Sequence, residues 1–161
     1  MIYIYTDGSK ITDRGFTHCG AAAILYNRET EISSVQLGLG GHTEVFDAEM
    51  AALATGASQA AEYIHNHPNT FFTDNAAAVH AISDPKPQVA QVFATNFHNT
   101  LRPILETHDT LTVRIAWCPS HCRIKGNDRA DTLAKAATQK ECQTPYSVSR
   151  SNALKIGRAH V

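Results

Sequence analysis

Two short apolar segments end in the same way, and this repetition constrains the fold more than any other feature of the sequence. "IYIYTDGS" carries Asp7 directly after one apolar run, and "FFTDNA" carries Asp74 after another. The first run is apolar at successive positions, which is typical of a central strand covered on both faces. We expect both aspartates at strand ends, at the sheet edge where open α/β folds place their sites. If the two strands are parallel neighbours, the carboxylates lie side by side, and such close like charges favour a cation between them.

The periodicity of the remaining chain predicts three more strands and four helices. Strands are expected at 18–27, 30–40 and 110–119, and helices at 43–64, 76–82, 88–108 and 126–139, with the first helix capped by Thr43. The last strand alternates at Leu111, Val113, Ile115 and Trp117. This order predicts an α/β fold with a five-stranded mixed sheet, in which three antiparallel strands are followed by parallel additions and helices flank the sheet.

Two further acids border the buried faces of predicted helices. Glu49 lies three residues after Phe46 and four before Leu53, so it borders the apolar stripe and is expected to point towards the sheet. Asp131, in "GNDRADTLAKAA", lies beside the small residues of a packed helix face. Any one of these acids alone is more simply explained as a cap or a solvated charge. Together, four carboxylates from two strand ends and two helix borders favour a divalent-cation site for Mg²⁺ or Mn²⁺, large enough for two ions.

Composition and charge exclude several classes of protein. The 161 residues are 43% hydrophobic and 18% charged, as in one globular domain. The formal net charge of −1 gives no global basic field, so a polyanion would need a local basic patch or metal ions. No apolar run reaches the roughly 18 residues of a membrane helix and no signal peptide opens the chain, so we expect an intracellular protein without membrane contact. The motif "CPSHC" at 118–122 has no second ligand pair, and we do not expect zinc there.

These motifs resemble those of the type 1 ribonuclease H family. The segments "YTDGS", "DAEM", "TDN" and "HCRIKGNDRAD" match its ordered D-E-D-D set over about residues 2–137. The closest likeness is to ribonuclease H domains attached to reverse transcriptases of non-LTR retroelements. The resemblance implies hydrolysis of the RNA strand of RNA–DNA hybrids, which leaves 5′-phosphate and 3′-hydroxyl ends. Carried onto this chain, Asp7, Glu49, Asp74 and Asp131 hold two Mg²⁺ ions, Mn²⁺ substitutes for them, and Asp7 bridges both.

The resemblance also implies roles for residues outside the acid set. His121, in the loop before the last helix, is expected to move protons or assist product release, since imidazole titrates near neutrality; the alternative is an ordinary surface histidine. Contacts to ribose 2′-hydroxyls are expected from Gly8, Ser9, Asn75 and Asn127. Glycine at position 8 would let the backbone approach a sugar-phosphate closely, although it could equally ease a turn.

The chain departs from larger cellular members of the family in its basic residues. The stretch between Asp74 and the last strand carries no Trp-bearing helix rich in lysine and arginine, and the basic residues are scattered. Because phosphate contacts dominate nucleic-acid affinity, we expect weak, salt-dependent binding of hybrid by the isolated domain, with an attached reverse transcriptase domain as a native partner. The protein is expected to be a monomer. Two alternatives stay open: a weakly active or non-catalytic module of a retroelement polyprotein, and another polynucleotidyl transferase of the same fold.

The sequence divides at about residue 140. Residues 1–140 are expected to form the catalytic domain, and residues 141–161 an irregular tail without a packing pattern. The final "KIGRAHV" back-translates to a common sequencing-library adapter, so we expect it to be an artefact of sequence assembly.

Overall fold

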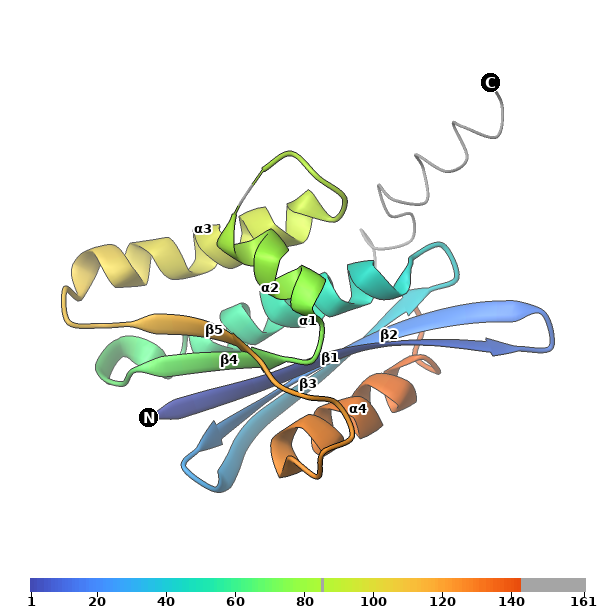
Figure 1. Cartoon of the computed structure of the whole chain (residues 1–161), viewed down its shortest axis with the longest axis horizontal. Coiled ribbons are helices and arrows are strands. Elements are labelled where there is room, and N and C mark those ends of the chain that lie inside the picture. Colours follow the sequence, from blue (N-terminus) through green and yellow to red (C-terminus); the bar gives the residue numbers. More distant parts are fainter. Residues whose placement is uncertain (85, 143–161) are drawn as a thin grey trace.

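The computed structural model describes residues 1–84 and 86–142, which form one mixed sheet with helices on both faces (Figure 1). The strands are β1 (Ile2–Asp13), β2 (Phe16–Asn27), β3 (Thr30–Gly40), β4 (Asn69–Thr73) and β5 (Val113–Trp117). The helices are α1 (Val45–Ala60), α2 (Ala76–Ser83), α3 (Gln91–Thr107) and α4 (Lys125–Ala137), with a short 3-10 turn, η1 (Ile64–Asn66), after α1. The strand order is β3-β2-β1-β4-β5, antiparallel from β3 to β1 and parallel from β1 to β5. The predicted five-stranded mixed sheet is therefore confirmed.

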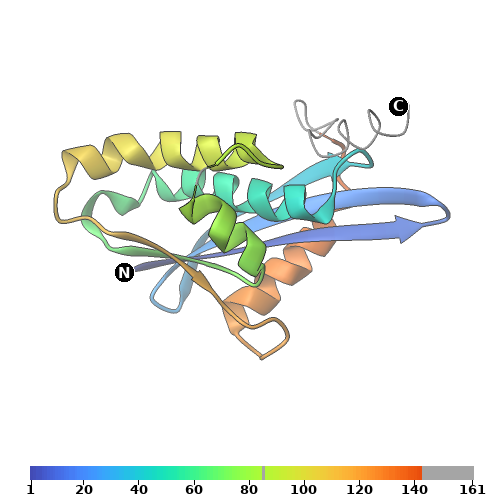
Figure 2. The same cartoon turned by 45° about the horizontal axis from the view of Figure 1, so that its top comes forward.

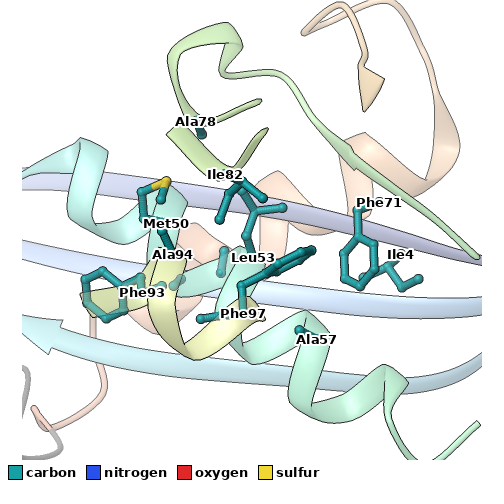
Figure 3. Packing of buried hydrophobic residues seen from close by; sticks show 14 of the residues in the cluster. Ile4, Met50, Leu53, Ala57, Phe71, Ala78, Ile82, Phe93, Ala94 and Phe97 are labelled. Carbon is teal, nitrogen blue, oxygen red and sulfur yellow. The ribbon is translucent and has the colours of Figure 1, made fainter. Parts of the chain in front are cut away.

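Two hydrophobic cores attach the helices to opposite faces of the sheet. Helices α1, α2 and α3 lie over one face, and α4 crosses the other (Figure 2). In the larger core the rings of Phe71 and Phe97 meet edge to face, with centroids 5.0 Å apart, near Leu53 (Figure 3). In the smaller core Ala130 of α4 packs with Ile24 of β2. The two cores thus fix α1 and α4, the helices that carry Glu49 and Asp131.

Strand β1 is longer than the sequence predicts. Its parallel pairing with β4 ends at Tyr5 opposite Phe72, whereas its antiparallel pairing with β2 continues to Asp13. Asp7 therefore lies inside β1, just past the point where one of the two neighbouring strands ends. The prediction that Asp7 ends the strand is wrong, because hydrogen bonding to β2 keeps the backbone extended beyond it. Asp74 does follow the end of β4, as predicted.

Helix α1 begins at Val45 with Glu44 as its N-cap, one residue after the predicted cap Thr43. The backbone N–H of Glu44 donates to Asp47 Oδ2 over 2.9 Å, and the Glu44 side chain accepts from the Asp47 backbone, which completes a capping box. The Thr43 hydroxyl donates instead to the carbonyls of Leu39 and Gly40. This start directs Glu49, one turn further on, towards the sheet, where it is 5% exposed.

Three of the predicted elements are shorter in the structure than the sequence indicates. Helix α1 ends at Ala60 and leaves Ile64 to η1, α3 begins at Gln91, and β5 covers only 113–117. Trp117 closes this short edge strand with 55% of its surface exposed, although the alternation of the sequence groups it with apolar residues that face inward. Its indole Nε1 donates to the Asp74 carbonyl over 3.0 Å. The tryptophan therefore lies at the surface beside Asp74 and not in the core.

Beyond α4 the chain returns to β3, where Cys142 forms an isolated parallel bridge with Gly38. Residues 143–161, which include most of the predicted tail and all of "KIGRAHV", lie outside the described residues. Within the described ranges, no helix combines the length and the hydropathy needed to cross a membrane.

Candidate functional site

Three of the four predicted acids meet at one end of the parallel pair β1 and β4. Asp7 comes from β1, Asp74 follows β4, and Glu49 reaches them from α1. Each offers a carboxylate oxygen, and the three oxygens lie within 4.8 Å of one another. Asp7 is 6% exposed and Glu49 is 5% exposed. The structure thus brings these carboxylates into contact in a largely buried setting, which is costly unless protons or cations offset their charge.

The threonine in each repeated Thr-Asp pair forms a hydrogen bond next to the acid cluster. The Thr6 hydroxyl donates to the Phe72 carbonyl over 3.2 Å, which ties β1 to β4 just before Asp7. Thr73 is fully buried, and its hydroxyl hydrogen-bonds to Glu49. The repeated threonine therefore has two different roles: Thr6 joins β1 to β4, and Thr73 bonds to Glu49.

The crowding of the acids raises two carboxyl pKa values. Burial, followed by the charges of Asp74 and Asp131, raises the pKa of Asp7 to about 7. Burial and then the charges of Asp7 and Asp74 raise the pKa of Glu49 well above its ordinary value, although hydrogen bonds from the Gly8 backbone and Thr73 oppose the shift. Both carboxyl groups thus favour a proton in the absence of a stronger cation.

One buried oxygen of the cluster has no partner among the described residues. Glu49 Oε2 is inaccessible to solvent and accepts no hydrogen bond there. An unsatisfied carboxylate oxygen in a buried site is unfavourable unless something binds it. Three carboxylates around such an atom form a donor set of hard oxygens, which suits Mg²⁺ or Mn²⁺.

Asp131, the fourth predicted acid, lies at the border of this cluster. It is not among the three carboxylates within 4.8 Å of one another, yet a protonated Asp7 donates a hydrogen bond to it. Its Oδ2 accepts a hydrogen bond from Lys135 Nζ over 2.7 Å, one turn further along α4. Asp131 therefore links the buried acids to a surface cation.

His121 lies in the loop between β5 and α4 and is exposed. Its backbone has a left-handed φ of 56°, as does Arg123 with 58°. Hydrogen bonds hold both ends of the loop: the Cys118 backbone N–H donates to the Thr73 carbonyl over 2.9 Å, and the Cys118 thiol donates to Asn127 Oδ1 over 3.4 Å. The histidine is therefore presented to solvent from a loop anchored beside Asp74.

The residues expected to contact substrate have structural partners of their own. A Cβ on Gly8 would lie 2.6 Å from the carbonyl carbon of Ala48, so glycine is needed for β1 to pass beneath α1. Ser9 and Asn127 are 9% and 3% exposed, and Asn75 caps α2 by accepting from the Ala78 backbone over 3.0 Å. Their contacts with a sugar backbone stay predictions, and the packing of Gly8 is a second reason for glycine there.

Three residues around the site were not found by sequence reasoning. Thr73 supports Glu49, and its repetition in "YTD" and "FTD" was a usable signal. Lys135 follows Asp131 by four residues, a spacing that predicts an ion pair on a helix. Cys118 has its pKa raised to about 11 by burial and by the charges of Asp74 and Asp7, so its thiol stays neutral. Only the folded arrangement brings Cys118 to the acids.

Comparison with known proteins identifies the family. The family model for RNase H matches residues 1–139. The chain belongs to the RNase H family. No curated protein matches the chain. Membership in the RNase H family supports a ribonuclease H hydrolase activity.

Solved structures share the RNase H fold with this chain at low sequence identity. A foamy viral protease-reverse transcriptase in complex with RNA/DNA hybrid is 19% identical with a TM-score of 0.70, over 86% of this chain and 20% of that chain. LC11-RNase H1 in complex with RNA/DNA hybrid is 16% identical with a TM-score of 0.63, over 86% and 96% of the two chains. RNase H1 from the archaeon Halobacterium salinarum is 18% identical with a TM-score of 0.61, over 84% and 96%. The chain thus spans a fifth of the viral protein but nearly the whole of the two RNase H1 proteins.

Proposed function

We propose that this protein hydrolyses the RNA strand of RNA–DNA hybrids with the help of two divalent cations. The observation that carries the proposal is the set of three carboxylates within 4.8 Å of one another, one of which has a buried oxygen without a partner in the described chain. Family membership supplies the reaction class. Two of the similar structures are described as complexes with RNA/DNA hybrid, which supports the same substrate here.

The residues fit divalent ions. Asp7, Glu49 and Asp74 would hold them, with Asp131 as a fourth ligand, and Mn²⁺ would substitute for Mg²⁺. Bound there, two such ions would lower the pKa of the attacking water and stabilise the leaving 3′ oxygen, which yields 5′-phosphate and 3′-hydroxyl ends. Because burial raises the pKa of both Asp7 and Glu49, cation binding must displace protons from this pair.

The remaining side chains orient substrate and move protons. Exposed on its anchored loop, His121 would accept or donate a proton at the departing product, since it lies outside the buried cluster. Asn75 would face the ribose of the cut strand through its amide nitrogen, because its Oδ1 already caps α2. Trp117 would keep Asp74 in register by its bond to the Asp74 carbonyl.

The decisive experiment compares substrates and metals. The protein is incubated with labelled RNA–DNA hybrid, duplex RNA and duplex DNA, in Mg²⁺, Mn²⁺ or EDTA. We expect cleavage of the RNA strand of hybrid alone, which EDTA abolishes and which Asp7→Asn and Asp74→Asn reduce at least about 10³-fold. Cleavage that survives EDTA, or equal cleavage of duplex DNA, contradicts the proposal.

The experiment also separates the non-catalytic alternative. A folded wild-type protein that binds hybrid but cleaves none in either metal would be such a module. The attached reverse transcriptase domain is a further proposal, supported by the similarity to a segment of a foamy viral protease-reverse transcriptase. The retroelement subgroup, the monomeric state and the intracellular location stay predictions from the sequence.

A further inference from the structure

Lys135 is a cation that lies at the edge of the acid cluster and belongs to the same helix as Asp131. Its Nζ is 2.7 Å from Asp131 Oδ2, and the side chains of the lysine and the aspartate are 53% and 30% exposed. The hydrogen bond to Asp131, and then the negative charges of Asp131 and Asp7, raise the pKa of Lys135, so the charge of Lys135 also acts on Asp7. The lysine thus neutralises part of the charge that a divalent ion would otherwise experience.

The helix itself gives only weak reasons for a lysine at position 135, one of which is its place in the last turn of α4, where the helix dipole favours a cation. The ion pair with Asp131 spans i to i+4 on a helix surface, where such contacts contribute about 0.3–0.5 kcal/mol to stability. Lys135 contributes no side chain to either hydrophobic core. Its electrostatic interaction with Asp131 and Asp7 is therefore the effect of Lys135 that bears on the acid cluster.

The same contact affects the geometry of the acids. Asp7, Glu49 and Asp74 lie within 4.8 Å of one another, and Asp131 is not part of that group. Lys135 engages Oδ2 of Asp131, while Asp7 hydrogen-bonds to the same carboxylate. To serve as a metal ligand, Asp131 must give up or share its bond with Lys135.

We propose that Lys135 raises the concentration of divalent ion needed to fill this site. It does so because it competes with the metal ion for Asp131 and thereby keeps this fourth carboxylate a weak ligand. The inference rests on the proposed function, because it takes the acid cluster to be a metal site. It assigns a role to a residue that is neither a ligand nor in contact with substrate. Lys135 is in this sense a positioning residue, which acts through Asp131.

The proposal predicts opposite effects of one substitution with and without metal. Without Mg²⁺, Lys135→Gln leaves the acids more strongly repelling, so the thermal unfolding midpoint falls slightly. With Mg²⁺, the same variant binds the ion more tightly, so the rise in midpoint on adding Mg²⁺ becomes larger than in the wild type. A purely structural role of Lys135 would lower the midpoint equally in both conditions.

Calorimetric Mg²⁺ titration of the whole protein without nucleic acid measures how much Lys135 weakens Mg²⁺ binding. We expect Lys135→Gln to lower the half-saturating Mg²⁺ concentration about three- to tenfold, the effect of one unit charge on a divalent ion across about 6–8 Å at high dielectric. Lys135→Arg, which retains the charge, should stay within about twofold of the wild type, and the gain of Lys135→Gln should shrink in high salt.

Arg129→Gln is the matched control. It removes the same charge from the same helix, but Arg129 pairs with Glu31 over 3.3 Å and not with a site acid. Its Mg²⁺ half-saturation should change less than about twofold. Lys135→Gln that binds Mg²⁺ no more tightly than Arg129→Gln overturns the inference.

Asp7→Asn separates this inference from the proposed function. If wild-type protein binds Mg²⁺, Asp7→Asn abolishes the binding and Lys135→Gln matches wild type, the inference alone fails. If wild-type protein shows no Mg²⁺ binding that depends on Asp7, the metal site of the proposed function fails and the inference fails with it.

Discussion

Asp7 shows how a carboxyl group suited to metal binding destabilises the protein when no metal is bound. Burial first, and then the charges of Asp74 and Asp131, raise its pKa from an ordinary value of 3.8 to about 7 in the folded protein. The folded state therefore binds this proton more tightly than the unfolded state does. The resulting stabilisation is fully present below about pH 4 and is lost as the pH rises through about 7.

We predict that metal-free protein loses up to about 4 kcal/mol of unfolding free energy from this group between about pH 4 and pH 8. Asp7→Asn cannot ionise, so its stability should depend less on pH and exceed that of the wild type at pH 8. Urea denaturation across this pH range in EDTA measures both. Parallel pH curves for the two proteins would contradict the assignment of the shift to Asp7.

The contact between β1 and α1 determines whether the acids meet at all. Gly8 lies in β1 next to Asp7, and a Cβ there would overlap the Glu49 backbone nitrogen and lie 2.6 Å from the Ala48 carbonyl carbon. Backbone atoms of a helix cannot yield as a flexible side chain does, so the two elements would have to separate. This separation would carry Glu49 away from Asp7.

We predict that Gly8→Ala destabilises the fold by about 3 kcal/mol and weakens Mg²⁺ binding together with stability. Gly15→Asn is the control: Gly15 lies in the β1–β2 turn at φ +80°, a Cβ added to it would meet no atom within 4 Å, and asparagine tolerates this conformation. Urea unfolding and Mg²⁺ titration of both variants test the point. Wild-type stability in Gly8→Ala would contradict the packing argument.

The same elements explain what sequence reasoning could reach. Asp7, Glu49 and Asp74 were found because strand ends and helix stripes leave a periodic signal, and the parallel pairing of β1 and β4 then brings them together. The full length of β1 was not predicted. Its second half is extended because it pairs with β2, and the residue pattern of β1 alone does not indicate this pairing. Trp117 was grouped with inward-facing residues because alternation does not reveal that an edge strand leaves one side open. The Cys118 environment depends on contacts across the sheet, which no local pattern encodes.

In the part of the chain that the structure describes, acids pair with four of the basic residues. Lys10, Lys86, Arg129 and Lys135 each form an ion pair with an acid at 3.3 Å or less, and the net charge of the chain is −1. In the described chain α2 is followed by α3, and α3 by β5. Among the described residues, no additional basic helix lies between these elements. The other basic residues of the described chain are scattered, and no added helix gathers them on one surface, which favours weak binding by this domain alone.

The cations nearest the acid edge should provide most of this weak binding. Lys125 is exposed at the start of α4, directly after the loop that carries His121. Arg102 of α3 lies in a surface pocket with Val113. Val113 begins β5, so this pocket lies at the end of the strands opposite to the acids. A hybrid held at the acids would contact the first residue and not the second.

We predict that hybrid binding by the non-cleaving Asp7→Asn protein weakens about 40-fold between 50 and 200 mM salt, as expected for about three phosphate contacts. Added Lys125→Gln should reduce the slope of log K against log salt by about 0.9, whereas added Arg102→Gln should leave it unchanged. Fluorescence anisotropy with labelled hybrid measures each slope. If Arg102→Gln lowers the slope as much as Lys125→Gln does, the hybrid does not lie beside the acids. If the affinity does not change with salt concentration, phosphate contacts do not account for the binding.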